Sequence, residues 1–120
     1  MKLIKILSLA FVLVSVSSYS QDYVLEELTV ATIDENYYVT VPVTPIEEYY
    51  YIDISHLSFE SEEQANNYIN AFLYANITRP VLNYEERYVV LQIMLEFIGD
   101  DRDPANLQTY LNRLSKPNKY

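Results

Sequence analysis

Cysteine and tryptophan are both absent from this chain of 120 residues, which also has a single glycine and a single histidine. Without cysteine the protein has no disulfide, no thiol nucleophile and no thiolate ligand for a metal. A single glycine excludes a glycine-rich phosphate-binding loop, and a single histidine excludes a two-histidine metal motif. We therefore expect no cofactor and no bound metal.

Basic residues are also few. The chain has 8 Lys and Arg against 17 Asp and Glu, a formal net charge of −9. A surface this acidic repels nucleic acids and anionic lipids. We expect a protein partner or self-association, no nucleic acid, and basic proteins as the partners of complementary charge.

The N-terminus has the layout of an export signal. Lys2 and Lys5 precede a mostly apolar stretch over 6–16, and Ser18 and Ser20 are small residues suited to a cleavage site. The segment resembles bacterial export signals, and its apolar run is too short for a membrane span. We predict a signal peptide over 1–20 and a periplasmic or extracellular protein without stable membrane insertion. Cleavage would leave six basic and 17 acidic residues, a formal charge of −11.

Hydrophobic periodicity predicts a single α+β domain over residues 21–120. Alternation indicates strands at 37–43, 49–55, 77–84 and 88–97, and residues 21–36 contain a further, loosely attached strand. Apolar residues at helical spacing predict helices over 61–76 and 104–114. Ser61 with Gln64 forms a capping box before the first helix, and Asp103 followed by Pro104 begins the second. Pro80 favours an edge position for strand 77–84.

The order strand, helix, strand, strand, helix over 49–114 resembles a ferredoxin-like plait, which normally ends in a fourth strand. A right-handed crossover makes strands 49–55 and 77–84 parallel, with strand 88–97 between them. No fourth strand can follow Leu114, so we predict that Tyr37–Val43 takes its place, antiparallel to strand 49–55. The result is a permuted plait (β-βαββα), a two-layer sandwich with two helices on one face of a mostly antiparallel sheet.

The register of strand 37–43 decides which face of the sheet stays open. In the register we prefer, its valines lie under the helices with alternate residues of the next strand: Val39, Val41, Val43, Tyr50, Ile52 and Ile54. In the other register the valines share a face with Tyr49 and Tyr51, and residues 23–33 or another subunit would have to cover it.

The open face is the best candidate for function, because the chain contains 13 tyrosines. Tyrosine combines a large apolar ring with a polar tip and suits contact surfaces. The predicted binding surface consists of Tyr38, Tyr49, Tyr51, Tyr88, Gln92 and Met94. Tyrosines on a bare sheet resemble the base-stacking platform of RNA-recognition domains, but the charge and the export signal leave protein or glycan contact.

Other candidates for chemistry are weaker. His56 has Asp53 and Glu60 nearby in sequence, which would suit a general base or a cation ligand. Acidic residues at 100, 101 and 103 lack the spacing of a calcium loop, and helix capping by Asp103 explains them more simply.

We therefore expect a small exported, non-catalytic protein-interaction domain. One alternative is an acidic inhibitor or immunity-type protein that blocks a basic exported enzyme. Another is an enzyme or cation-binding protein that uses His56 and the nearby acids.

Overall fold

A computed structural model describes residues 23–114. Its strands are β1 (Thr29–Ile33), β2 (Val39–Thr40), β3 (Tyr49–Asp53), β4 (Thr78–Asn83) and β5 (Tyr88–Ile93). Its helices are α2 (Glu62–Leu73) and α3 (Pro104–Leu114), with short 3-10 turns η1 (Leu25–Glu27) and η2 (Leu95–Phe97). The predicted signal peptide over 1–20 lies outside the described residues. Within 23–114, no helix is both long and apolar enough to cross a membrane.

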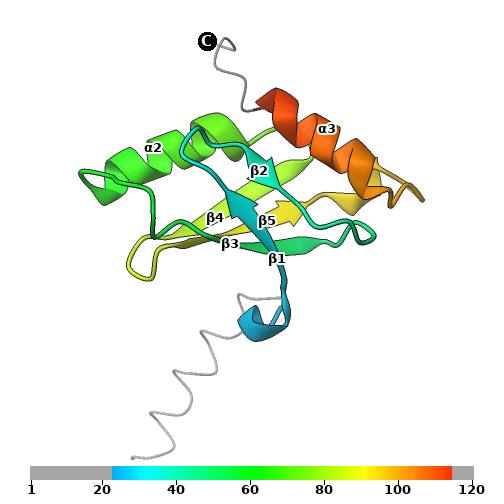
Figure 1. Ribbon diagram of the computed structural model, residues 1–120, viewed down its shortest axis with the longest axis horizontal. Coiled ribbons are helices and arrows are strands. Elements are labelled where there is room, and N and C mark those ends of the chain that lie inside the picture. Colours follow the sequence, from blue (N-terminus) through cyan, green and yellow to red (C-terminus); the bar gives the residue numbers. More distant parts are fainter. Residues whose placement is uncertain (1–22, 115–120) are drawn as a thin grey trace, which may run out of the picture.

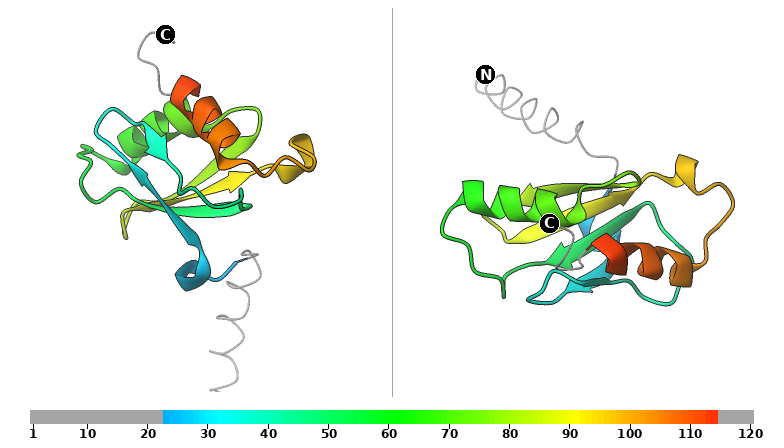
Figure 2. Two further views of the ribbon diagram at one scale, coloured as in Figure 1. Left: turned by 45° about the vertical axis from the view of Figure 1, so that its right-hand side comes forward. Right: turned by 90° about the horizontal axis from the view of Figure 1, so that it is seen from above.

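The strands form one sheet in the order β2-β1-β3-β5-β4. All neighbours are antiparallel except β1 and β3, which are parallel. Both helices lie on one face of this sheet and η1 lies on the other (Figures 1 and 2). The predicted α+β class, with two helices on one face of a mostly antiparallel sheet, is confirmed. The position of β5 between β3 and β4, and of β4 at an edge, is confirmed as well.

The predicted place of Tyr37–Val43 is wrong, and the permuted plait is not what the strand pairing shows. β1 lies beside β3, with Thr29 opposite Tyr50, while β2 pairs only with the far side of β1. Residues 34–48 are long enough to serve as a crossover, which parallel strands require. The Ile46 N–H, near the end of this crossover, donates to the Arg102 carbonyl at 2.9 Å.

The core lies between the sheet and the two helices. Its sheet side comes from alternate strand residues, and its helix side from one stripe of each helix. The most buried of these residues are Ala31, Ile33, Val39, Tyr50, Ile52, Val89, Leu91, Ile93, Ala65, Ile69, Leu73, Leu107 and Leu111. The preferred register is correct for Val39 and Val41, which are buried, and wrong for Val43, which is 92% exposed. Pro42 lacks an N–H and cannot extend the ladder, so the chain leaves the sheet before Val43.

Side-chain caps fix the helix ends. The Gln64 N–H donates to Ser61 Oγ at 3.1 Å, and Gln64 Oε1 accepts from the Glu60 N–H at 2.8 Å. At the other end of α2, buried Thr78 Oγ1 donates to the Leu73 carbonyl at 2.6 Å. These bonds satisfy backbone groups that a helix cannot pair internally, so they set where α2 begins and ends.

Each outer strand of the sheet has a different protection along its free edge. Gln108 of α3 donates from Nε2 to the Val39 carbonyl at 2.7 Å and accepts from the Val41 N–H at 2.8 Å, so its amide imitates a neighbouring strand. On β4, Pro80 lies opposite Leu91. The Ile93 N–H faces β3, so by alternation the backbone nitrogen of Pro80 faces away from β5. A missing donor there costs the ladder nothing.

Candidate functional site

An apolar row crosses the open face of the sheet, the face opposite the helices. The strand register aligns Val30 of β1 with Tyr51 of β3, Tyr51 with Val90 of β5, and Val90 with Val81 of β4. Val90 is only 2% exposed, whereas Val30 and Val81 at the two ends are 59% and 58% exposed. The face therefore presents apolar surface to solvent on either side of a covered centre.

Tyr51 and Tyr88 form a stacked pair on this face. Their ring centroids lie 5.1 Å apart with an interplanar angle of 27°. Tyr51 is opposite Val90, and the next pair on the same face is Asp53 with Tyr88. Tyr51 and Tyr88 are therefore diagonal neighbours, and their rings meet across the two strands. The Tyr88 hydroxyl accepts a hydrogen bond from Asn83 Nδ2 at 3.2 Å. Stacking and this bond hold both rings in place while leaving them half-buried.

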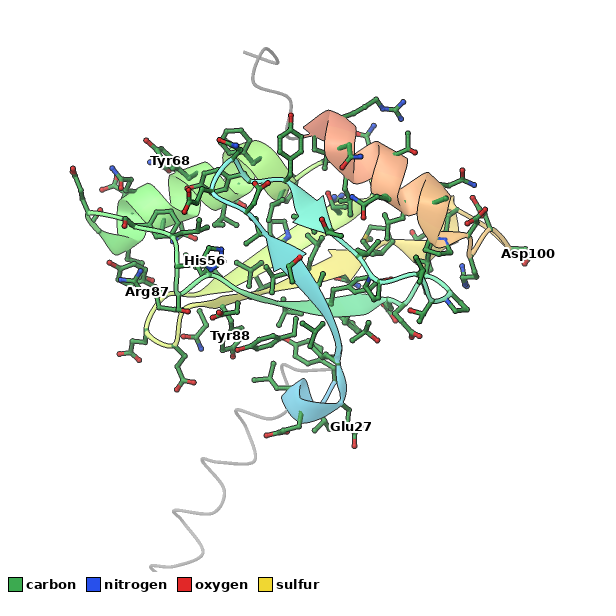
Figure 3. The ribbon with its side chains drawn as sticks, viewed as in Figure 1. Glu27, His56, Tyr68, Arg87, Tyr88 and Asp100 are labelled. Atoms are coloured by element: carbon green, nitrogen blue, oxygen red, sulfur yellow. The ribbon has the colours of Figure 1, made fainter. Side chains whose placement is uncertain are left out.

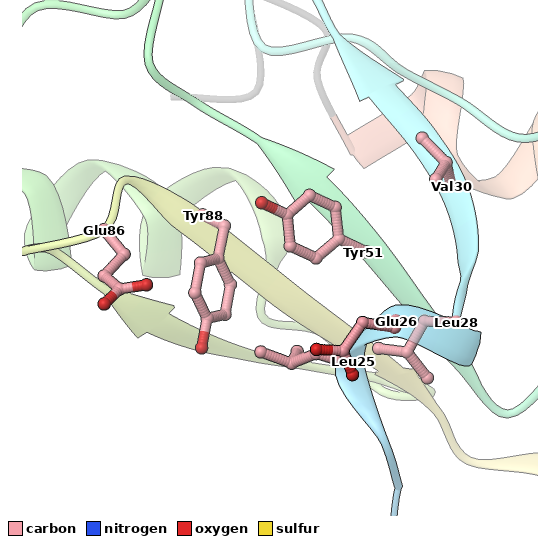
Figure 4. Close-up of a pocket in the computed structure, with 7 residues that line it drawn as sticks. All are labelled: Leu25, Glu26, Leu28, Val30, Tyr51, Glu86 and Tyr88. Atoms are coloured by element: carbon pink, nitrogen blue, oxygen red, sulfur yellow. The ribbon is translucent and has the colours of Figure 1, made fainter.

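A groove of about 390 Å³ runs past these two rings. We call it the tyrosine groove; its lining residues are Leu25, Glu26, Leu28, Val30, Tyr51, Glu86 and Tyr88. In Figure 4, Glu86 from the β4–β5 turn lies on one side of the rings and the residues of η1 lie on the other. Both glutamates are exposed, and no basic residue is among the lining residues within the described part of the chain. The groove is therefore aromatic and apolar at its base and anionic at its rim.

Two of the six predicted surface residues line the groove, Tyr51 and Tyr88. Tyr49 and Gln92 are a cross-strand pair on the same open face but lie outside the groove, and Tyr38 and Met94 are not among its lining residues either. The Tyr49 ring packs 4.8 Å from that of Tyr23, and Gln92 Nε2 donates to Glu48 Oε2 at 3.1 Å. Tyr38 belongs to the β1–β2 hairpin, where its N–H donates to Asp34, and Met94 precedes η2.

Sequence reasoning missed the residues that η1 and the β4–β5 turn add to the groove. Residues 23–33 were expected to cover the open face or, within 21–36, to contain a loosely attached strand, which is β1. Tyr23 does pack against Tyr49, but η1 stands beside the Tyr51–Tyr88 pair and forms a wall. The apolar spacing of Leu25, Leu28 and Val30 was the available signal for this wall.

His56 is hydrogen-bonded to the backbone of β1. Its Nε2 donates to the Ile33 carbonyl at the end of β1, at 2.7 Å, and so ties the β3–α2 loop to that strand. The Asp53 carboxylate accepts instead from the backbone N–H and hydroxyl of Ser55, at 3.2 and 3.0 Å. Figure 3 shows Tyr88 on the sheet face opposite the helices.

The acidic group before α3 is organised by local hydrogen bonds. Asp103 Oδ1 accepts from the Ala105 N–H at 3.0 Å and caps α3. Asp101 accepts from the Asp103 N–H and from Asn106 Nδ2, both at 3.0 Å, and these bonds lower the pKa of Asp101. Within residues 23–114, no group of three or more His, Asp or Glu is arranged to hold a metal ion.

Comparison of the chain with protein-family models, with curated proteins and with solved structures gave no match.

Proposed function

We propose that the protein is a small exported, non-catalytic binding domain that holds a protein partner in the tyrosine groove. The observation that supports this is the stacked Tyr51–Tyr88 pair, half-buried at the base of a groove and next to exposed Val30. Aromatic rings held in place beside exposed apolar surface are typical of the centres of protein interfaces.

A second candidate is an inhibitor or immunity-type protein that blocks a basic exported enzyme. The formal charge of −9 and the two exposed glutamates at the groove rim support it. Complementary charge would speed association with a basic partner and make binding sensitive to salt. Both candidates use the same surface and differ in what the partner does.

The test is capture of a partner by the chain without residues 1–20, immobilised and exposed to the secreted and periplasmic proteins of its source organism. The Tyr51→Ala, Tyr88→Ala double variant is compared with Tyr74→Ala, which removes an exposed tyrosine from the helix layer. We expect wild type and Tyr74→Ala to retain one partner that the double variant loses, with circular dichroism showing that all three are folded. Equal retention by the folded double variant would disprove the use of this groove.

A further inference from the structure

We infer that the tyrosine groove receives a positively charged side chain of the partner, with arginine preferred over lysine. This inference rests on the proposed function and adds to it the chemical class of the group that binds. The groove combines a stacked pair of phenol rings with a carboxylate on either side, from Glu26 and Glu86. Ring faces attract cations, and carboxylates pair with them.

Arginine fits this combination better than lysine does. A guanidinium is planar, so it can stack on a tyrosine ring while its N–H groups point outward in the ring plane towards carboxylates at the rim. A lysine ammonium is compact and more strongly hydrated, and it cannot form such a bidentate, stacked contact. The groove volume of about 390 Å³ falls at the lower end of the range for ligand sites, about 300–1,000 Å³.

Arginines stack on tyrosine rings elsewhere in the molecule. Arg79 lies over the Tyr74 ring at 4.6 Å, and Arg87 lies over the Tyr84 ring at 4.3 Å. Residues 23–114 contain these two cation–π contacts, and neither involves Tyr51 or Tyr88. Tyr51 and Tyr88 therefore receive no arginine from within residues 23–114.

Charge also disfavours the other occupants. A second copy of a chain with a formal charge of −9 would bring further carboxylates towards Glu26 and Glu86, and like charges repel. A neutral glycan would stack on the rings and donate hydroxyl hydrogen bonds to the rim carboxylates, but it brings no positive charge to complement them. A cationic side chain on a basic protein would stack on the rings and also pair with the rim carboxylates.

The experiment is an NMR titration of the chain without residues 1–20 with four probes. These are a capped (Arg-Gly)₄ peptide, the same peptide with lysine or with citrulline in place of arginine, and cellohexaose. The lysine peptide is expected to bind more weakly than the arginine peptide, and equal or tighter binding would overturn the preference for arginine. Citrulline keeps the shape and most hydrogen bonds of arginine but carries no charge. We expect the arginine peptide to shift the amide signals of Val30, Tyr51 and Tyr88, and the citrulline peptide to bind at least about fivefold more weakly.

Matched double variants separate a specific site from diffuse charge. Glu26→Gln with Glu86→Gln removes both rim carboxylates, and Glu27→Gln with Glu85→Gln removes two exposed neighbours that do not line the groove. Both doubles change the net charge by the same amount. We expect the first to weaken binding of the arginine peptide by about 3- to 20-fold and the second by less than about twofold.

Several results would overturn the inference. They are equal binding of the citrulline peptide, equal weakening by the two double variants, no binding of the arginine peptide, or shifts at the groove from cellohexaose alone. Binding of the natural partner, captured as described above, distinguishes failure of this inference from failure of the proposed function. A partner that needs Tyr51 and Tyr88 but binds the Glu26→Gln, Glu86→Gln variant normally would keep the proposed function and reject the cationic side chain.

Discussion

Gln108 provides the sharpest test of how the sheet is held together. Its side-chain amide makes three hydrogen bonds: Nε2 donates to the Val39 carbonyl and to Asn112 Oδ1, and Oε1 accepts from the Val41 N–H. Gln108→Met removes these bonds while keeping the length of the side chain. Methionine and glutamine have similar helix propensities, so α3 itself should be unaffected.

The expected loss follows from the two bonds to the backbone of β2 and the residue just after it. A net contribution of about 0.5–1.5 kcal/mol for each bond gives a loss of about 1–3 kcal/mol in the free energy of unfolding. The site is only half-buried, so water can partly replace the lost partners, and a value near the lower end is expected. For a domain of this size the melting temperature should fall by about 4–8 °C per kcal/mol.

The assay is chemical denaturation of wild type, Gln108→Met and Gln92→Met, together with amide hydrogen exchange. Within residues 23–114, the side chain of Gln92 bonds only to the exposed carboxylate of Glu48, so Gln92→Met should change stability by less than about 0.5 kcal/mol. In Gln108→Met the Val41 amide should exchange much faster than in wild type. Unchanged stability together with unchanged exchange at Val41 would show that Gln108 does not act as a strand partner.

Hydrogen bonds and backbone geometry elsewhere in the domain give three further predictions. Thr78→Val leaves the last carbonyl of α2 without its buried donor and should cost about 1–3 kcal/mol of unfolding free energy, against less than about 0.5 kcal/mol for exposed Thr32→Val. Hydrogen bonds, first from the Asp103 N–H, lower the folded-state pKa of Asp101, so its stabilisation is present above the ordinary carboxyl pKa of about 3.9 and is lost as the pH falls through the lowered value. Thermal melts of Asp101→Asn and wild type should therefore differ most near pH 6 and converge towards pH 2, and a constant difference would contradict this. Gly99 has φ of +60°, and a Cβ atom at this position would meet nothing within 4 Å, so Gly99→Ala should cost about 1–2 kcal/mol from backbone strain alone, and no change in denaturation midpoint would refute this.

Local patterns predicted most elements of residues 49–114, because each carries its own chemical signal. The strand expected over 88–97 is the exception: β5 ends at Ile93, residues 95–97 form η2, and Phe97 is exposed. Ser61 and Asp103 cap their helices as expected, and their side-chain bonds are present. Alternation in β5 placed Val89 and Leu91 inward, and both are buried. These features depend on neighbours within a few residues, which a sequence displays directly.

The position of Tyr37–Val43 could not be predicted in this way, because it depends on contacts far along the chain. The Val41 N–H donates to Gln108, 67 residues later, instead of to a strand beside it. The same limit applies to the tyrosine groove, where Glu26 and Glu86 come together only because η1 and the β4–β5 turn meet on one face. Alternation identified Tyr51 and Tyr88 as residues of that face but gave no sign of the wall that η1 adds.

Pro80 affects whether the protein can form fibrils at high concentration. Growth of cross-β fibrils requires each new strand to form hydrogen bonds along an exposed sheet edge. The outer side of β4 lacks its central donor at Pro80, so an incoming strand would meet a break in the middle of the row. The protein can therefore display a tyrosine-rich, partly apolar sheet face without also offering this edge as a template for fibrils.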